Sequence, residues 1–158
     1  MASIKTEYKV AAVQAAPAFL DLRAGVTKAI KLMKEAADNG ASLIAFPEVW
    51  LPGYPWWIWT ETPAAGFKFL RQYFENSMVY GDENFKRLCD AAAQFRIHVV
   101  MGYVERAGGS LYLAQATIDD EGRCISNRRK LKPTHVERSV FGEGNGSDLV
   151  VVDTKLGK

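Results

Sequence analysis

Charged side chains directly after two predicted strands are the residues of this chain best placed to do chemistry. Glu48 follows a short apolar run at 42–46, which predicts a buried strand. Lys130 ends a later run, 124–130, and Lys132 follows it closely, both inside a cluster of positive charge. The strand ends of an α/β sheet form the rim at which ligands and catalytic groups lie. A carboxylate on that rim could act as a general base, and an ammonium could point into the same site.

Each of these charged residues also has a plain structural explanation. Glu48 could cap a helix or lie on the surface after Pro47, and the basic run 128–132 could be a solvated strand end. A nucleic-acid partner is not expected, because 20 Lys and Arg against 18 Asp and Glu leave a net charge of only +2. Alternation along a strand turns Lys130 and Lys132 to the same side, so periodicity leaves the choice between them open.

The histidines and cysteines differ in what their surroundings indicate. His98 lies in an apolar run and is expected to be a core residue, whereas His135 lies in a polar loop and could be functional. Cys89 is on the apolar face of a predicted helix, and Cys124 has no helix N-terminus nearby to favour its thiolate. Neither cysteine is expected to be a nucleophile. No Cys/His spacing or carboxylate-rich loop indicates a metal site, and the glycines at 142–146 lack the ending of a phosphate-binding loop.

All four tryptophans fall on one proline-rich, loop-like stretch, which predicts a local aromatic cluster. They are Trp50, Trp56, Trp57 and Trp59, with Tyr54 among them. Such a cluster could form the wall of a pocket for an uncharged, even aromatic, ligand. It could equally pack the loop onto the core or fill an interface between subunits. The residues themselves leave all three interpretations open.

The predicted elements indicate an α/β fold with a mixed sheet and helices over at least one face. Strand, helix and strand follow one another at the start, which predicts a parallel pair with a right-handed crossover. Two later runs around a polar turn at 119–122 predict a hairpin. We expect strands over 10–16, 42–46, 97–104, 111–118, 124–130 and 149–152, with the first two buried. We expect a helix over 22–37 capped by Asp21, one over 64–75, and one after Asp82 with its apolar face at 85–95.

Length and composition limit the class of protein. A chain of 158 residues with 48% hydrophobic and 24% charged residues is typical of one globular domain. The first eight residues lack the apolar core of a secretory signal, and no apolar run approaches the roughly 20 residues of a membrane span. Two cysteines cannot form a disulfide framework. We therefore expect a cytoplasmic protein with free thiols and no membrane partner.

Four segments together resemble the nitrilases, which belong to the carbon–nitrogen hydrolase superfamily. They are Val10–Ala15, Phe46–Glu48, Leu51–Pro55 and Arg129–Arg138. The likeness covers the chain from about Tyr8 to its end. The run Lys-Leu-Lys-Pro-Thr-His-Val-Glu-Arg is specific to true nitrilases, whereas the Pro-Glu pair is shared with amidases and carbamoylases. The tryptophan-rich loop is most similar to that of bacterial enzymes that hydrolyse arylacetonitriles.

The resemblance implies a four-layer α-β-β-α sandwich, of which residues 1–158 would be the N-terminal part of a single domain. It implies that Glu48 is the general base, that Lys130 stabilises the tetrahedral intermediate and that Glu137 is a second glutamate holding both in place. Tyr54 and Trp57 would contact the substrate. No metal and no cofactor are expected. Family members pair through a helical face and extend into spiral filaments, so a homodimer and larger homo-oligomers are expected.

The family nucleophile is a cysteine in a motif that follows the strand expected at 149–152, beyond Lys158. Neither Cys89 nor Cys124 matches that motif, so the resemblance implies that the thiol lies outside these 158 residues. The expected function is hydrolysis of an organic nitrile, such as an arylacetonitrile, to a carboxylic acid and ammonia through a thioimidate. The alternatives are an inactive fragment that serves only as an assembly or binding subunit, and an amidase or cyanide hydrolase of the same superfamily.

Overall fold

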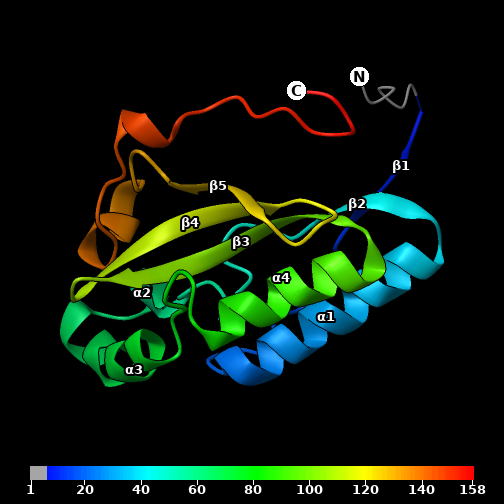
Figure 1. The fold of residues 1–158 in the computed structure, drawn as a ribbon. Helices are drawn as coiled ribbons and strands as arrows, with labels where there is room; N and C mark the ends of the chain where they lie inside the picture. Colours follow the sequence, from blue (N-terminus) through cyan, green and yellow to red (C-terminus); the bar gives the residue numbers. More distant parts are fainter. Residues whose placement is uncertain (1–6) are drawn as a thin grey trace.

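One mixed sheet of five strands forms the centre of the computed structural model, which describes residues 7–158. The strands are β1 (Lys9–Ala12), β2 (Ala41–Ala45), β3 (His98–Ala107), β4 (Ser110–Ile118) and β5 (Cys124–Arg129). They lie in the order β1-β2-β3-β4-β5, as Figure 1 shows. β1, β2 and β3 are parallel, and β3, β4 and β5 are antiparallel to one another in turn. The α/β class, the parallel unit and the hairpin are thereby confirmed.

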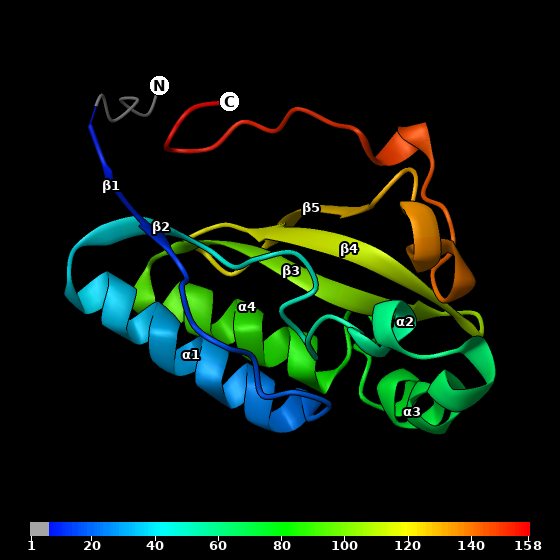
Figure 2. The same cartoon turned by 180° about the vertical axis from the view of Figure 1, so that it is seen from behind.

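Two long helices, α1 (Leu22–Asp38) and α4 (Glu83–Phe95), lie side by side against one face of this sheet (Figure 1 and, from behind, Figure 2). The side chain of Asp21 accepts a hydrogen bond from the backbone N–H of Ala24 at 2.9 Å and so begins α1, and Asp82 caps α4 in the same way. The apolar faces of both helices and of the sheet form the main core. Its fully buried residues include Val26, Ala29, Met33, Leu88, Ile44, Val99 and Met101.

A second apolar cluster lies at one end of the sheet. There α2 (Trp57–Thr60) and α3 (Pro63–Glu75) pack against β3 and β4 through residues such as Tyr73, Val104 and Leu113. Two short 3-10 helices, η1 (His135–Ser139) and η2 (Gly146–Asp148), follow β5. In Figures 1 and 2, η1 lies at the same end of the molecule as α2 and α3.

Three expectations about the elements need correction. β1 is not buried: Val10 is 58% exposed, because β1 is an edge strand and Val10 points away from the core that Ala11 contacts. Residues 149–152 form no strand. A strand needs a neighbouring backbone, and within residues 7–158 none pairs with this β-branched run, whose Val151 is 81% exposed. The loop-like stretch around the tryptophans contains the single turn of helix α2.

The topology brings particular strand ends together. β2 and β3 are parallel, and two antiparallel steps from β3 through β4 turn β5 back into the same direction. β2 and β5 therefore run in the same direction and both end beside the middle of β3: Ala45 pairs with Val100, and Arg129 pairs with Ala114, whose partner on β3 is Tyr103. The segments that follow β2 and β5 contain the charged residues singled out in the sequence.

Candidate active site

Glu48 and Lys130 meet over the face of the sheet, beside the middle of β3 and β4. Lys130 Nζ lies 3.0 Å from Oε1 of Glu48, although the two residues follow strands that are separated by β3 and β4. The backbone N–H of Lys130 donates to the carbonyl oxygen of Leu113 at 2.7 Å, which continues the pairing of β5 with β4. The lysine is thus held by the sheet, and its side chain extends over the intervening strands to reach Glu48.

Gly102 of β3 permits this meeting. A Cβ at Gly102 would lie 2.1 Å from the carbonyl oxygen of Pro47 and 2.9 Å from Cα of Glu48. Only glycine therefore lets the loop after β2 cross so closely over β3. A cavity of about 250 Å³ opens beside this crossing. It is lined by Glu48, Gly102, Leu113, Ala114, Gln115, Arg128 and Lys130.

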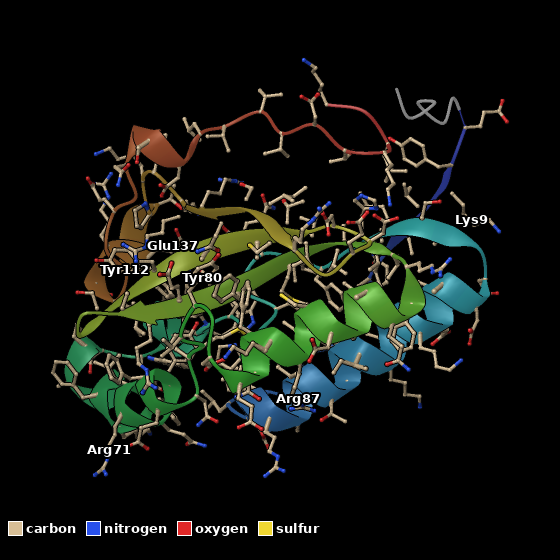
Figure 3. The ribbon with its side chains drawn as sticks, in the orientation of Figure 1. Lys9, Arg71, Tyr80, Arg87, Tyr112 and Glu137 are labelled. Carbon is tan, nitrogen blue, oxygen red and sulfur yellow. The ribbon has the colours of Figure 1, made fainter. Side chains whose placement is uncertain are left out.

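Glu137 is the buried partner of Lys130 (labelled in Figure 3). Its side chain is 5% exposed, and its Oε2 accepts a hydrogen bond from Lys130 Nζ at 3.0 Å. The backbone N–H and the hydroxyl of Thr134 donate to the same oxygen at 2.7 and 2.9 Å. Thr134 and Glu137 form a capping box at the start of η1. The local fold of this loop therefore aims the carboxylate at the ammonium.

The surroundings keep both groups ionised. Burial alone would raise the pKa of Glu137, but hydrogen bonds from Thr134, Lys130 and Tyr54 outweigh it and hold the pKa below its usual value. Burial would lower the pKa of Lys130, but hydrogen bonds to Glu137 and Glu48 raise it. Lys130 is therefore an ammonium at neutral pH. It has three N–H groups, of which two point to carboxylates, so one remains for a ligand in the cavity.

The two residues expected to contact substrate lie in different surroundings. Tyr54 donates its hydroxyl hydrogen to Oε1 of Glu137 at 3.0 Å and so belongs to the charged cluster. Trp57 is 7% exposed and packs edge-on against Tyr73 in the second apolar cluster. It also lines a separate cavity of about 440 Å³ between α2, α3 and η1. Neither side chain lines the 250 Å³ cavity.

The aromatic loop combines two of the three interpretations left open by the sequence. Trp50 and Trp57 pack the loop onto the protein, and Trp50 also donates its indole N–H to the carbonyl of Ala15 at 2.8 Å. Trp56 and Trp59 are 66% and 51% exposed. Trp59 lies beside the second cavity, so this part of the loop does form a wall.

Other candidate residues are not in the cluster. Lys132 turns to the surface, where its Nζ lies 2.6 Å from Oε2 of Glu143 and its side chain is 69% exposed. His135 stacks its ring on Trp59, with centroids 5.3 Å apart. His98 is buried in β3, as expected of a core histidine. In residues 7–158 no group of three or more His, Cys, Asp or Glu side chains could hold a metal ion, and no helix is long and apolar enough to cross a membrane.

The two cysteines lie on the helical side of the sheet, packed against the main core. Both are free thiols. Burial raises the pKa of Cys89 to about 11 and also raises that of Cys124. Neither lines the cavity beside Glu48 and Lys130. The expectation that neither is a nucleophile is consistent with both observations.

Sequence reasoning missed two residues that shape the site, although each had a signal. The Thr-x-x-Glu spacing of Thr134 and Glu137 is that of a capping box, which indicates a carboxylate fixed by its own loop. Gly102 stands alone inside an apolar strand, which is typical of a close approach by another backbone. The sequence does not say which segment approaches, because Pro47 is far away in the chain.

Known proteins similar to this chain share its sequence closely over about half of their own length. The chain is 52% identical to an aliphatic nitrilase of Rhodococcus rhodochrous, over 97% of this chain and 42% of that protein. It is 51% identical to an arylacetonitrilase of Aspergillus niger, over 97% of this chain and 45% of the relative. A cyanide hydratase of Neurospora crassa is 45% identical over 98% of this chain and 44% of its own length.

The fold is similar to that of a solved amidase structure. An amidase from Nesterenkonia sp. AN1 superposes with a TM-score of 0.68 at 19% sequence identity, over 88% of this chain and 50% of the amidase. This likeness shows the fold, of which the described residues supply one sheet and its helical layer. The family model for carbon–nitrogen hydrolases matches residues 9–158, nearly the whole chain. The chain belongs to the carbon–nitrogen hydrolase family.

Proposed function

We propose that the protein carrying this chain hydrolyses an organic nitrile to a carboxylic acid and ammonia. The observation that carries the proposal is the Lys130 ammonium held between Glu48 and Glu137 at the mouth of a cavity. The similarity to nitrilases of two substrate types supports the same reaction. Residues 1–158 are proposed to be the N-terminal part of a single hydrolase domain.

The first chemical step is attack of a cysteine thiol, supplied from outside residues 1–158, on the nitrile carbon. Glu48 accepts the thiol proton as the S–C bond forms. One π bond of the nitrile breaks, and its nitrogen takes a proton, which gives a thioimidate. The free N–H of Lys130 stabilises the negative charge that develops on this nitrogen. Glu137 keeps the ammonium charged and in place.

Two water molecules complete the reaction. Glu48 activates the first, which adds to the thioimidate carbon and forms a tetrahedral intermediate. The C–N bond breaks, ammonia leaves and a thioester remains. The second water hydrolyses the thioester, releases the acid and returns the thiol. The overall balance is one nitrile and two waters to one acid and one ammonia, so no oxidant or reductant is needed.

The aromatic loop is proposed to select the substrate. Tyr54 lies next to the charged cluster, and Trp57 lines the 440 Å³ cavity between α2, α3 and η1. Uncharged aromatic walls of this kind favour an apolar, aromatic substituent on the nitrile. We therefore propose an arylacetonitrile such as phenylacetonitrile as the substrate class.

Ammonia release from phenylacetonitrile tests the proposal, using the natural gene product that contains these residues. Glu48→Gln removes the general base and should lower kcat by roughly 10²- to 10⁴-fold. The matched control is Glu143→Gln, which removes an exposed carboxylate paired with Lys132 and should leave kcat unchanged. Full turnover by Glu48→Gln would overturn the site assignment.

Parallel assays separate the alternatives within and outside the superfamily. The similarity to a cyanide hydratase favours potassium cyanide as a second substrate to test, with formamide or formate as the product. Phenylacetamide tests amidase activity. Turnover of cyanide or amide without turnover of phenylacetonitrile would replace the nitrilase proposal. No turnover of any of them would indicate an assembly or binding subunit.

The remaining proposals concern assembly and location. We propose a homodimer that extends into larger spiral oligomers, and Trp59 and Phe67 provide exposed apolar surface on α2 and α3. Light scattering after size exclusion measures this directly, and a monomeric mass would contradict it. A cytoplasmic location suits the two free thiols. Neither a nucleic acid nor a membrane is proposed as a partner.

A further inference from the structure

The Glu137 carboxylate is held by two different kinds of partner. Its Oε2 takes hydrogen bonds from Thr134 and Lys130, which belong to the same loop as Glu137 itself. Its Oε1 takes one from the hydroxyl of Tyr54, which is 83 residues away in the sequence. Tyr54 is therefore the contact that ties this carboxylate to a second part of the fold.

The direction of this hydrogen bond is fixed by a third residue. The indole N–H of Trp59 lies 3.0 Å from the hydroxyl oxygen of Tyr54, and an indole N–H can only donate. An ionised carboxylate can only accept, so the single hydroxyl hydrogen of Tyr54 goes to Glu137. The chain of donors runs in one direction from Trp59 through Tyr54 to Glu137. Burial raises the pKa of Tyr54, and the neighbouring carboxylate adds to this, so the hydroxyl keeps its hydrogen at neutral pH.

Trp59 is itself held against η1. Its ring stacks on that of His135, with planes 8° apart, and His135 lies in the same short helix as Glu137. The segment 54–60, which contains Tyr54 and α2, is therefore joined to η1 twice, once by the stacked rings and once by the Tyr54 hydrogen bond. A displacement of one contact would disturb the other.

We propose that Tyr54 and Trp59 are positioning residues that orient the Glu137 carboxylate and, through it, the Lys130 ammonium. This inference rests on the proposed function, because Glu137 and Lys130 have a catalytic role only in that proposal. It assigns Tyr54 to the charged cluster instead of to direct substrate contact. The hydroxyl hydrogen is already committed to Glu137 and one lone pair to Trp59. Tyr54 does not line the cavity beside Glu48 and Lys130.

Tyr54→Phe tests the proposal, because it removes only the hydroxyl. Loss of a hydrogen bond to a charged group changes an equilibrium or rate constant by about 10- to 100-fold. We therefore expect kcat to fall by about that factor. KM for phenylacetonitrile should stay within about twofold, since the ring remains. The Tyr54 hydrogen bond also lowers the pKa of Glu137. Its loss should therefore move the acidic limb of the kcat/KM profile to higher pH.

A second variant and a matched control show whether an effect comes from this hydrogen bond. Trp59→Phe retains an aromatic ring to stack on His135 but removes the N–H, and should give a smaller change in the same direction. Tyr112→Phe is the control, because Tyr112 contacts the guanidinium of Arg129 through its ring face, 3.8 Å away. Figure 3 labels Tyr112 and Glu137. Wild-type kinetics are expected of the control.

Two kinetic outcomes would overturn the inference. A KM raised several-fold at unchanged kcat would mean that Tyr54 contacts the substrate. Unchanged kcat, KM and pH profile would mean that the hydrogen bond has no role.

A measurement without turnover separates this inference from the proposed function. Carbon-13 NMR of labelled glutamate carboxyl groups follows the titration of Glu137 directly. The pKa should be higher in Tyr54→Phe and in Trp59→Phe than in the wild type, even if no nitrile is hydrolysed. An unshifted titration would reject the inference, whereas absent nitrile turnover alone would reject only the proposed function.

Discussion

Two lysines in this structure each lie between two carboxylates, at opposite ends of β5. Lys130 contacts Glu48 and Glu137, both at 3.0 Å. Lys155 contacts Asp120 at 2.9 Å and Glu121 at 3.1 Å, beside the turn between β4 and β5. In both clusters one ammonium lies between two carboxylates at nearly the same distances. Distance alone does not distinguish a site from a surface ion pair.

Burial and connection to the fold distinguish the two clusters. The side chain of Lys155 is 52% exposed and that of Lys130 is 27% exposed. Each lysine has one carboxylate partner that is about half exposed, Glu121 and Glu48. The other partners differ, since Asp120 is 20% exposed and Glu137 only 5%. Water and salt screen an exposed pair, while the partly buried pair keeps its charges and its geometry. The Lys130 cluster also faces a cavity and is joined to Tyr54 of a distant loop. These features suit it to chemistry.

Lys130→Ala should distinguish the two lysine clusters most clearly. It removes the ammonium that is proposed to stabilise developing charge, so kcat for phenylacetonitrile should fall by about 10²- to 10³-fold. Lys155→Ala removes the exposed counterpart and should leave kcat at the wild-type value. Steady-state ammonia release measures both. Equal losses in the two variants would show that the difference in burial has no catalytic meaning.

Gly102→Ala tests whether the meeting of Glu48 and Lys130 depends on a close backbone crossing. The added Cβ would lie 2.1 Å from the carbonyl oxygen of Pro47, so the loop after β2 must move. Overpacking of this kind costs about 1–3 kcal/mol in the free energy of unfolding. The displaced Glu48 should also lower kcat.

Gly146→Ala is the matched control for this change. A Cβ at Gly146 would meet nothing within 4 Å. Unfolding by denaturant should show wild-type stability for it. If Gly102→Ala were as stable and active as the wild type, the loop after β2 could move away from β3 without displacing Glu48. The close crossing would then not be required for the site.

The pH dependence of stability should differ between the buried cluster and the exposed one. The pKa of Glu137 is lowered from 4.5, so its stabilisation is complete above about pH 4.5 and is lost as the pH falls through the folded value. The pKa of Lys130 is raised from 10.5, so its contribution is complete below that value and is lost as the pH rises through the folded one. Both contributions are present together between these limits.

Glu137→Gln makes this dependence measurable. Its free energy of unfolding should fall furthest below that of the wild type near neutral pH, and the difference should shrink below pH 4.5. Glu121→Gln, in the exposed cluster, should give a smaller difference at each pH. A difference for Glu137→Gln that stayed constant from pH 7 to pH 3 would argue against an ionised, hydrogen-bonded carboxylate.

Local signals in the sequence were sufficient for most of the fold. The caps at Asp21 and Asp82 and the apolar spacing after them located both long helices, and the polar turn at 119–122 located the hairpin. The strand expected at 149–152 failed because β-branched residues give only a propensity, and a strand also needs a partner backbone. β1 was misjudged for a related reason, since an apolar run does not show whether a strand lies at an edge.

The site was less accessible to sequence reasoning, because it depends on contacts between distant segments. Alternation could not choose between Lys130 and Lys132, and only the family resemblance preferred Lys130. The structure separates them physically: the backbone of Lys130 is still paired to β4, while Lys132 lies past the strand and pairs with Glu143 at the surface. The link from Tyr54 to Glu137 had no sequence signal at all.

Lys155→Ala should have the smallest effect of these substitutions. Its free energy of unfolding tests whether the exposed cluster contributes to stability. The lysine joins the segment after η2 to the β4–β5 turn by ion pairs in which its own side chain is half exposed to water. Long exposed side chains lose conformational entropy when they pair, and this offsets most of the Coulomb energy. The midpoint of denaturant unfolding should therefore match that of the wild type at 0.15 M salt and differ slightly, if at all, at low salt. A large loss of stability that persists in high salt would mean that this exposed cluster holds the chain together as firmly as the buried one.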